Sequence, residues 1–260
     1  METTLSQAYV TLRSLIGSQM EDIAVFERAE EHRAYWRPKK VRVVLLAESH
    51  VYTNASDLTA TLDRSSLLPP DIPTGFVRLV YCMGYGENAL LREPIETPRN
   101  SGTPQFWEIF HSCIHSVTTR MDFSPVHVSK TELSNRIRHK VSVLEQLRSN
   151  GIWLVDASIA ALYQPGTPKQ SPQWINQALA ASWNAYTRQV VADANPEAIL
   201  CVGLGVARAL RPELTRLGIA WSAVRQPNAR ASTEEHLRSF AAYYAVCRDP
   251  KSICDVRFVG

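Results

Sequence analysis

The stretch "SNGIWLVDAS", residues 149–158, contains the apolar run Ile152–Val155 followed directly by Asp156. A short apolar run of this kind, bounded by a glycine, predicts a buried strand. A strand that stops on Asp156 would bring a carboxylate to the exposed end of the protein core. Because ligands of open α/β sheets bind beyond the carboxyl ends of the strands, Asp156 is a candidate site residue.

Three other segments predict strands of the same kind: Val41–Ala47, the start of "AILCVGLG" (198–205) and the start of "GIAWSAVRQPNA" (218–229). Helical patterns separate these strands. Four of the helical segments are residues 5–35, "TPQFWEIFHSCIHSV" from residue 103, residues 172–194, and a helix beginning in "VARALRPEL". Two more helices have capping signals. One has a capping box at Ser129 and Glu132 and a C-cap at Gly151, and the other runs from a capping box at Ser232 and Glu235 to about Cys247. This alternation predicts an α/β domain with a parallel sheet.

The four expected strand ends should meet at one edge of that sheet. They are "AESH" (47–50), "DAS" (156–158), "GLG" (203–205) and "RQPNA" (225–229). A carboxylate such as Glu48 at this edge can orient water or stabilise a developing cation, although a surface acid is the plain alternative.

The glycines and the last strand end supply weaker candidates. Gly203 and Gly205 open a helix whose backbone N–H groups would bind phosphate, but tight packing explains them equally well. "RQPNAR" offers Gln226 and Asn228 as hydrogen-bond donors and Arg230 as a reaching cation, with an ordinary polar turn as the alternative.

Composition sets broad limits. The 260 residues suit a single domain, 1–260, with an N-terminal helical segment (1–40) and a loop-rich insertion (53–103) that holds one short strand or helix near Phe76–Cys82. A net charge of +3 permits nucleic-acid binding without arguing strongly for it. No apolar run is long enough to span a membrane, and no signal peptide is evident. Five cysteines without a close pair are typical of reduced thiols, so a cytoplasmic protein is expected.

Other motifs favour structural interpretations. His111 and His115 lie four residues apart on an expected helix, as a metal pair would, but no third ligand is evident and no metal is expected. Tyr81 and Tyr85 could stack on a base, although aromatic residues belong more often to the core. The basic stretch Arg136, Arg138, His139 and Lys140 is interpreted as a solvated helix face.

The order of the strand ends resembles that of the uracil-DNA glycosylase superfamily. "AESH" stands where that family has a Gly-Gln-Asp-Pro-Tyr or Gly-Glu-Ala-Pro loop, and "GIWLVDAS" resembles its Gly-Val-Leu-Leu-Leu-Asn strand. "AILCVGLG" resembles the strand that ends in a phosphate-contacting Gly-Ser turn, and "RQPNAR" resembles the His-Pro-Ser-Pro-Leu loop. "TPQFWEIF" resembles the helix that begins with proline and holds a DNA phosphate. The resemblance covers roughly residues 40–245.

The resemblance implies a three-layer α/β/α fold with a central four-stranded parallel sheet. It implies a monomeric enzyme without metal or cofactor, which flips a nucleotide out of double-stranded DNA and hydrolyses its N-glycosidic bond. The implied roles are as follows: catalysis by Glu48, Asp156 and Gln226; substrate contacts by Ala47, Ser49, His50, Tyr81, Tyr85 and Asn228; and DNA contacts by Pro104, Gly203, Leu204, Gly205, Pro227 and Arg230.

Two departures from the family pattern change the expected substrate. The family's base-stabilising histidine is Gln226 here, and its base-reading asparagine is Asp156. An ionised Asp can only accept hydrogen bonds, and cytosine presents the N4 amino donor that it needs. A proton shared between Asp156 and cytosine N3 would remove the repulsion there. We therefore expect a modified cytosine as the substrate.

A known counterpart fits that expectation. A bacterial anti-phage glycosylase of this superfamily removes α-glucosyl-hydroxymethylcytosine from phage DNA. The insertion at 53–103 could shape an enlarged pocket for such a base, with a decoration of the family fold as the plain alternative. Three alternatives stay open: a glycosylase for uracil or a damaged base, a non-catalytic DNA-binding protein on the same fold, and a hydrolase of free nucleotides or nucleosides.

Overall fold

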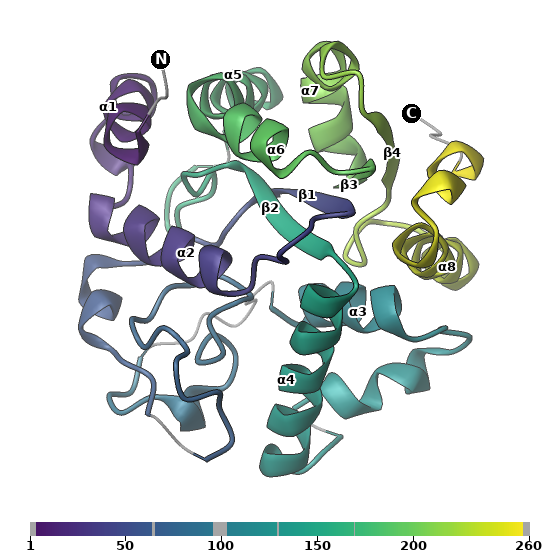
Figure 1. Ribbon diagram of the computed structural model, residues 1–260. Helices are drawn as coiled ribbons and strands as arrows, with labels where there is room; N and C mark the ends of the chain where they lie inside the picture. Colours follow the sequence, from purple (N-terminus) through teal and green to yellow (C-terminus); the bar gives the residue numbers. More distant parts are fainter. Residues whose placement is uncertain (1–3, 64–65, 96–102, 129, 169, 257–260) are drawn as a thin grey trace.

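The computed structural model describes residues 4–63, 66–95, 103–128, 130–168 and 170–256 (Figure 1). Within these residues, four parallel strands form one sheet in the order β2-β1-β3-β4. The strands are β1 (Val43–Ser49), β2 (Ile152–Ser158), β3 (Ala198–Val202) and β4 (Ala220–Val224). The predicted α/β class, the parallel sheet and its four strands are confirmed.

Helices lie on both sides of this sheet. The longer helices are α1 (Leu5–Ile16), α2 (Ile23–Tyr35), α3 (Thr103–Ile114), α4 (Leu133–Ser149), α5 (Pro172–Ser182), α6 (Arg188–Ala194), α7 (Leu204–Arg216) and α8 (Thr233–Arg248). Figure 1 shows α5, α6 and α7 on one side of the sheet, with α3 and α4 on the opposite side. The arrangement is compatible with the expected three-layer α/β/α fold.

The second strand extends further than its sequence suggests. Every residue of β2 is buried, and its pairing with β1 continues through Ala47↔Asp156 to Ser49↔Ser158. Asp156 therefore lies inside the strand and not at its exposed end, so the expected boundary is wrong. The acid is tolerated inside the sheet because a buried arginine from α2, Arg33, pairs with it.

Local sequence signals explain several helix ends. Ser232 and Glu235 form the expected capping box at the start of α8. Helix α4 begins after Glu132, whose carboxylate accepts hydrogen bonds from the backbone N–H groups of residues 134 and 135; the expected partner Ser129 lies outside the described residues. Gly151 follows α4 with φ +76°, and a Cβ there would lie 2.8 Å from the Lys40 carbonyl oxygen, so both backbone angle and space require glycine.

The segment Phe76–Cys82 forms neither a strand nor a helix, contrary to the prediction. It is a series of buried turns, closed by the hydrogen bonds Leu79 N–H to Val77 C=O and Cys82 N–H to Leu79 C=O. Consecutive apolar residues are buried here because the chain turns inside the core, and such a run does not specify a period. The Arg78–Asp57 ion pair, at 2.9 Å, fastens these turns to the start of the insertion.

The helical segment at 172–194 contains one irregularity. Between α5 and α6 the chain passes through a π-helical stretch, Trp183–Thr187. The Thr187 hydroxyl from this stretch donates to the backbone carbonyls of Asp156 and Ala157 at 3.3 and 3.2 Å. A widened helical turn thereby supports the strand that carries the candidate base-reading residue.

Candidate functional site

The carboxyl ends of the strands surround connected hollows, as the topology predicts. A groove of about 360 Å³ is lined by Glu48, Ser49, Gln226 and Asn228 from two of these ends, together with Gln105, Phe106, Tyr163 and Gln164. Ser49, His50 and Phe106 also line a deeper pocket that contains Asp156. Glu48, Tyr163 and Gln226 also line a second hollow at the start of α7. The four strand ends therefore contribute to one site.

Glu48 is the acid that faces the groove. It occupies the penultimate position of β1 and is partly buried, and its carboxylate accepts a hydrogen bond from the Tyr163 hydroxyl. Burial raises the pKa of Glu48 above its ordinary value, against the opposing effect of that hydrogen bond. A carboxylate with a raised pKa is a stronger base, which is what the positioning and deprotonation of a water molecule require.

Asp156 lies at the bottom of the deeper pocket, bound to a cation. Its Oδ2 atom is 2.8 Å from Arg33 Nη2, and both side chains are only 2% exposed. The pocket holds about 20 Å³, which is room for one water molecule. Tyr85 and Phe106 are among its walls. A flipped base could reach Asp156 only if walls such as these two side chains move outward.

His50 links Asp156 to a second buried acid. Its Nε2 atom lies 3.0 Å from Glu21 Oε2, and its Nδ1 atom lies 4.0 Å from Asp156 Oδ2. Burial lowers the pKa of His50, but the Glu21 carboxylate, and to a smaller extent Asp156, raise it above the ordinary value. His50 Nδ1 has no hydrogen-bond partner among the described residues. The pocket thus contains a histidine ring nitrogen beside an acceptor carboxylate.

Glu21 also holds the two loops that follow β1 and β2. Its Oε1 atom accepts from the Thr53 N–H at 2.7 Å, and its Oε2 atom accepts from the Ala161 N–H at 2.9 Å. A buried carboxylate is stabilised by several charge-assisted donors of this kind. The N-terminal helical segment is therefore part of the site, through both Glu21 and Arg33.

Gln226 stands where the last strand leaves the sheet. Its Nε2 atom donates to the Val202 carbonyl at 3.2 Å, and the other amide hydrogen remains to donate elsewhere. Gly203 has φ +109°, and a Cβ on it would lie 2.9 Å from Gln226 Nε2. The glycine of the third strand end is therefore required by its backbone angle, and a Cβ there would also displace the Gln226 side chain.

The start of α7 forms a basic hollow of about 350 Å³. Gly203 is the N-cap residue, and Leu204 and Gly205 form the first turn, so backbone N–H groups point out of the helix end here. Arg208 and Arg225 line the same hollow. A helix N-terminus flanked by two arginines attracts a phosphate group.

The start of α3 faces the loop after β4. Pro104 from the first turn of α3, and Pro227 and Asn228 from the loop, line a further hollow of about 410 Å³ together with Arg120. Pro104, Pro227 and Asn228 are therefore neighbours along the rim of the site. Arg120 is partly neutralised, since its Nη1 atom lies 2.7 Å from Glu108.

Three of the predicted site residues lie elsewhere. Ala47 is fully buried within β1. Tyr81 is also buried, and its hydroxyl accepts a hydrogen bond from the Leu154 N–H at 2.8 Å, so it supports β2. Arg230 is exposed in the loop before α8 and is not among the residues that line the hollows described above. Ala47 and Tyr81 line none of the hollows described above.

The interpretation of the basic stretch on α4 is wrong for two of its members. Arg136 and Lys140 are buried, and both pair with Glu87, at 2.7 and 2.6 Å. Burial opposes ionisation of this acid, but Arg136 and Lys140 hold the pKa of Glu87 below its ordinary value. Two cations are buried here because both pair with the same carboxylate from the insertion, and the sequence of α4 alone carries no sign of that partner.

Several site residues have no evident sequence signal. Arg33, Glu21 and Arg208 occupy ordinary helical or turn contexts, and Tyr163 and Gln164 lie in the irregular stretch after β2. Only their position near a predicted strand end could have indicated Tyr163 and Gln164.

Comparisons with known proteins assign no family. Neither a scan against protein-family models nor a search of curated proteins finds a match. Within the described residues, no helix is both long enough and apolar enough to cross a membrane.

Proposed function

We propose that this protein is a DNA glycosylase of the uracil-DNA glycosylase type, which acts as a cytoplasmic monomer on double-stranded DNA and excises a modified cytosine. The observation that carries the proposal is the position of Glu48. It is a partly buried carboxylate of raised pKa at a strand end, in a groove that continues into a pocket lined by Asp156 and His50. No metal ion takes part in the proposed step.

The proposed reaction is hydrolysis of the N-glycosidic bond. The bond between C1′ and the base breaks, and its electron pair leaves with the base. The Glu48 carboxylate stabilises the developing positive charge on the sugar and orients a water molecule. The water oxygen bonds to C1′, its proton passes to Glu48, and the base leaves as a neutral molecule once it is protonated. The products are an abasic site and the free base.

Asp156 and His50 together match the pairing edge of cytosine. Cytosine presents a donor at N4 and an acceptor at N3, whereas uracil presents an acceptor at O4 and a donor at N3. The Asp156 carboxylate would accept from N4, and His50 Nδ1–H, when it carries the proton, would donate to N3. Protonation at N3 also makes the base a better leaving group. The raised pKa of His50 supports this role.

Two glutamines in the groove support a base that carries a sugar. The Oε1 atoms of Gln105 and Gln164 are buried and accept no hydrogen bond among the described residues. Both side chains line the 360 Å³ groove beside Glu48. Unpaired buried acceptors are costly, and the hydroxyl groups of a glucosyl substituent would satisfy them. We propose α-glucosyl-hydroxymethylcytosine, as found in modified phage DNA, as the preferred substrate.

The basic hollow at the start of α7 would hold the DNA backbone. The backbone N–H groups of Leu204 and Gly205, with Arg208 and Arg225, supply donors for one phosphate. Pro104 and Pro227 on the other side of the groove would contact the strand on its far side. This arrangement supports DNA as the substrate in preference to a free nucleoside, which has no phosphate for the hollow to bind.

The direct test measures abasic sites in duplexes that differ at one base: cytosine, hydroxymethylcytosine, α-glucosyl-hydroxymethylcytosine or uracil. We expect cleavage of the glucosylated duplex, and loss of that cleavage in Glu48→Gln and Asp156→Asn. Preferential release of uracil by the wild type would contradict the cytosine argument. Tight DNA binding without abasic sites on any duplex, including glucosylated phage DNA, would indicate a non-catalytic DNA-binding protein.

A further inference from the structure

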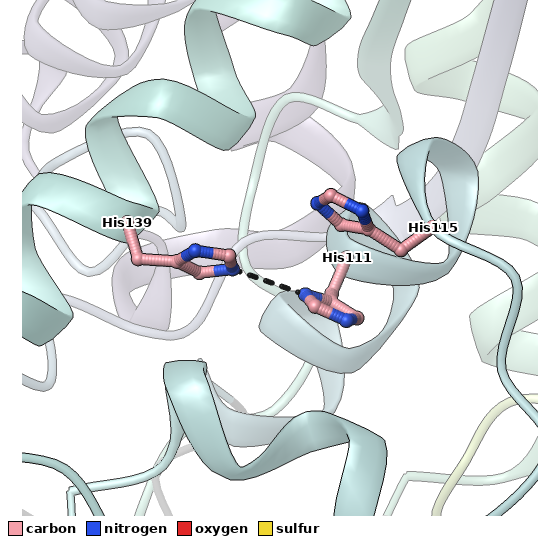
Figure 2. Close-up of side chains that lie close together, drawn as sticks. All are labelled: His111, His115 and His139. Carbon is pink, nitrogen blue, oxygen red and sulfur yellow. Dashed lines mark hydrogen bonds between the residues drawn. The ribbon is translucent and has the colours of Figure 1, made fainter.

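Three histidines from two neighbouring segments meet away from the proposed catalytic groove. His111 lies in the last turn of α3, His115 directly follows that helix, and His139 lies on the facing surface of α4 (Figure 2). One ring nitrogen from each residue lies within 4.8 Å of the other two. In Figure 2 the three rings point toward one another, with a hydrogen bond joining His111 and His139. The i, i+4 pair visible in the sequence thus acquires a third member from α4.

The spacing of these nitrogens suits a tetrahedral metal ion. His111 Nδ1 and His139 Nε2 are 3.2 Å apart. Two ligands at a Zn–N distance of about 2.0–2.1 Å and a tetrahedral angle lie about 3.3 Å apart. Two of the three nitrogens therefore already have the separation that the ion requires, and the nitrogen of His115 lies within 4.8 Å of both.

The protonation of the cluster also suits a metal. Burial, helped by the neighbouring His115 and His139, lowers the pKa of His111 to about 4. Burial likewise lowers the pKa of His115, and burial together with His115 lowers that of His139. Neutral imidazole is the form that binds a metal ion. His115 and His139 are partly exposed, which leaves a path for the ion and a position for a water ligand.

Packing alone does not account for the cluster. His111 also packs edge-on against Phe123, an apolar environment that an apolar side chain would fill at lower cost. His115 Nε2 is buried and has no hydrogen-bond partner among the described residues. A metal ion would satisfy this nitrogen by coordination.

We propose that His111, His115 and His139 form a three-histidine site for Zn²⁺ that joins α3 to α4, with water as the fourth ligand. Imidazole ligands suit Zn²⁺ and its first-row neighbours, so Co²⁺ serves as a spectroscopic substitute. The ion would brace α3, whose first turns carry Gln105 and Phe106 into the groove. It would lie outside the groove itself, so its role is to stabilise the helix pair.

The test uses the full-length, tag-free protein after chelator treatment and desalting. Zn²⁺ is added, the protein is desalted again, and bound zinc is measured by mass spectrometry. We expect one equivalent in the wild type, a melting temperature several degrees higher with Zn²⁺ than without, and visible d–d absorption with Co²⁺. His139→Ala and His115→Ala should each weaken Zn²⁺ binding at least about tenfold.

His127→Gln is the matched control. This histidine is a near neighbour, 3.3 Å from Glu108, but it is not a member of the cluster, so its replacement should leave zinc uptake unchanged. Wild-type protein that retains no zinc would overturn the proposal, as would equal retention by the wild type and either cluster variant. Far-UV circular dichroism shows whether each variant is folded. If His139→Ala does not fold, zinc uptake by His115→Ala, which changes a partly exposed residue, tests the proposal. None of these results depends on glycosylase activity.

Discussion

Replacing Arg33 with methionine should lower the free energy of unfolding, because it leaves the Asp156 carboxylate inside the sheet without its ion-pair partner. Arg33 Nη2 lies 2.8 Å from Asp156 Oδ2, and each side chain is 2% exposed. Methionine preserves much of the side-chain volume but removes the cation. His50 would remain nearby, with its Nδ1 atom 4.0 Å from the same oxygen. Asp156 would then be a buried charge without a hydrogen-bonded ion-pair partner.

Breaking a buried ion pair on one side costs about 3–5 kcal/mol. Total folding stability is typically about 5–15 kcal/mol, so the loss is a large share of it. For a domain of this size it corresponds to a fall in melting temperature of roughly 6–20 °C. Asp156→Asn should cost less, because Arg33 keeps its second partner, Glu30. The double variant should be more stable than Arg33→Met by at least about 1 kcal/mol, since it contains no unpaired carboxylate.

Urea unfolding at pH 7, followed by tryptophan fluorescence and far-UV circular dichroism, measures all three variants. Arg238→Met is the control, because that arginine forms an ion pair with Glu234 on the open surface, and its loss should leave the free energy of unfolding unchanged. The reasoning is refuted if Arg33→Met is within about 1 kcal/mol of the wild type. It is also refuted if the costs of the two single changes simply add in the double variant.

Three further perturbations test the site. Glu48→Gln should lower base excision at least about 100-fold. Burial raises the pKa of Glu48, so ionisation of this side chain opposes folding as the pH rises through that pKa. The variant should therefore have a higher melting temperature than the wild type at pH 8 and the same melting temperature at pH 4. Gly203→Ala should lower the free energy of unfolding by about 1–3 kcal/mol, because Gly203 has a φ of +109° and lies against Gln226. Gly205→Ala is the control and should not destabilise the protein, because the space around Gly205 is open. Arg208→Gln should weaken DNA binding equally on all sequences and reduce the slope of log affinity against log salt by about 1; a sequence-dependent loss would contradict the phosphate assignment.

The sheet was predictable because its strands carry their signal locally. β1 and β3 are buried along most of their lengths, so each appears as an unbroken apolar run. Once the strands and the intervening helices are assigned, parallel topology brings their carboxyl ends together without further information. Glu48, Asp156, Gln226 and the glycine turn at Gly203 were therefore available as candidates from the sequence, and the structure brings them into neighbouring hollows.

The partners of these residues were not predictable, because they depend on how helices dock. Arg33 reaches Asp156 across 123 residues of sequence, and Glu87 reaches Lys140 across 53. His139 completes the histidine cluster only because α4 packs against α3 with that face inward. No periodicity within one helix specifies which side chain of a distant helix it will meet. The same limit explains why two buried cations on α4 appeared to belong to a solvated face.

The position of Glu21 has a consequence for the order in which the chain can fold during synthesis. This acid leaves the ribosome early, but one of its three partners, the Ala161 N–H, lies 140 residues further along. A nascent chain that ends before that residue cannot complete the hydrogen bonds around the carboxylate, which must stay hydrated until then. The helices α1 and α2 therefore reach their final arrangement around Glu21 only after Ala161 has been translated. The groove beside Glu48 is completed only after this docking, although Glu21, which holds the loops around it, is made long before.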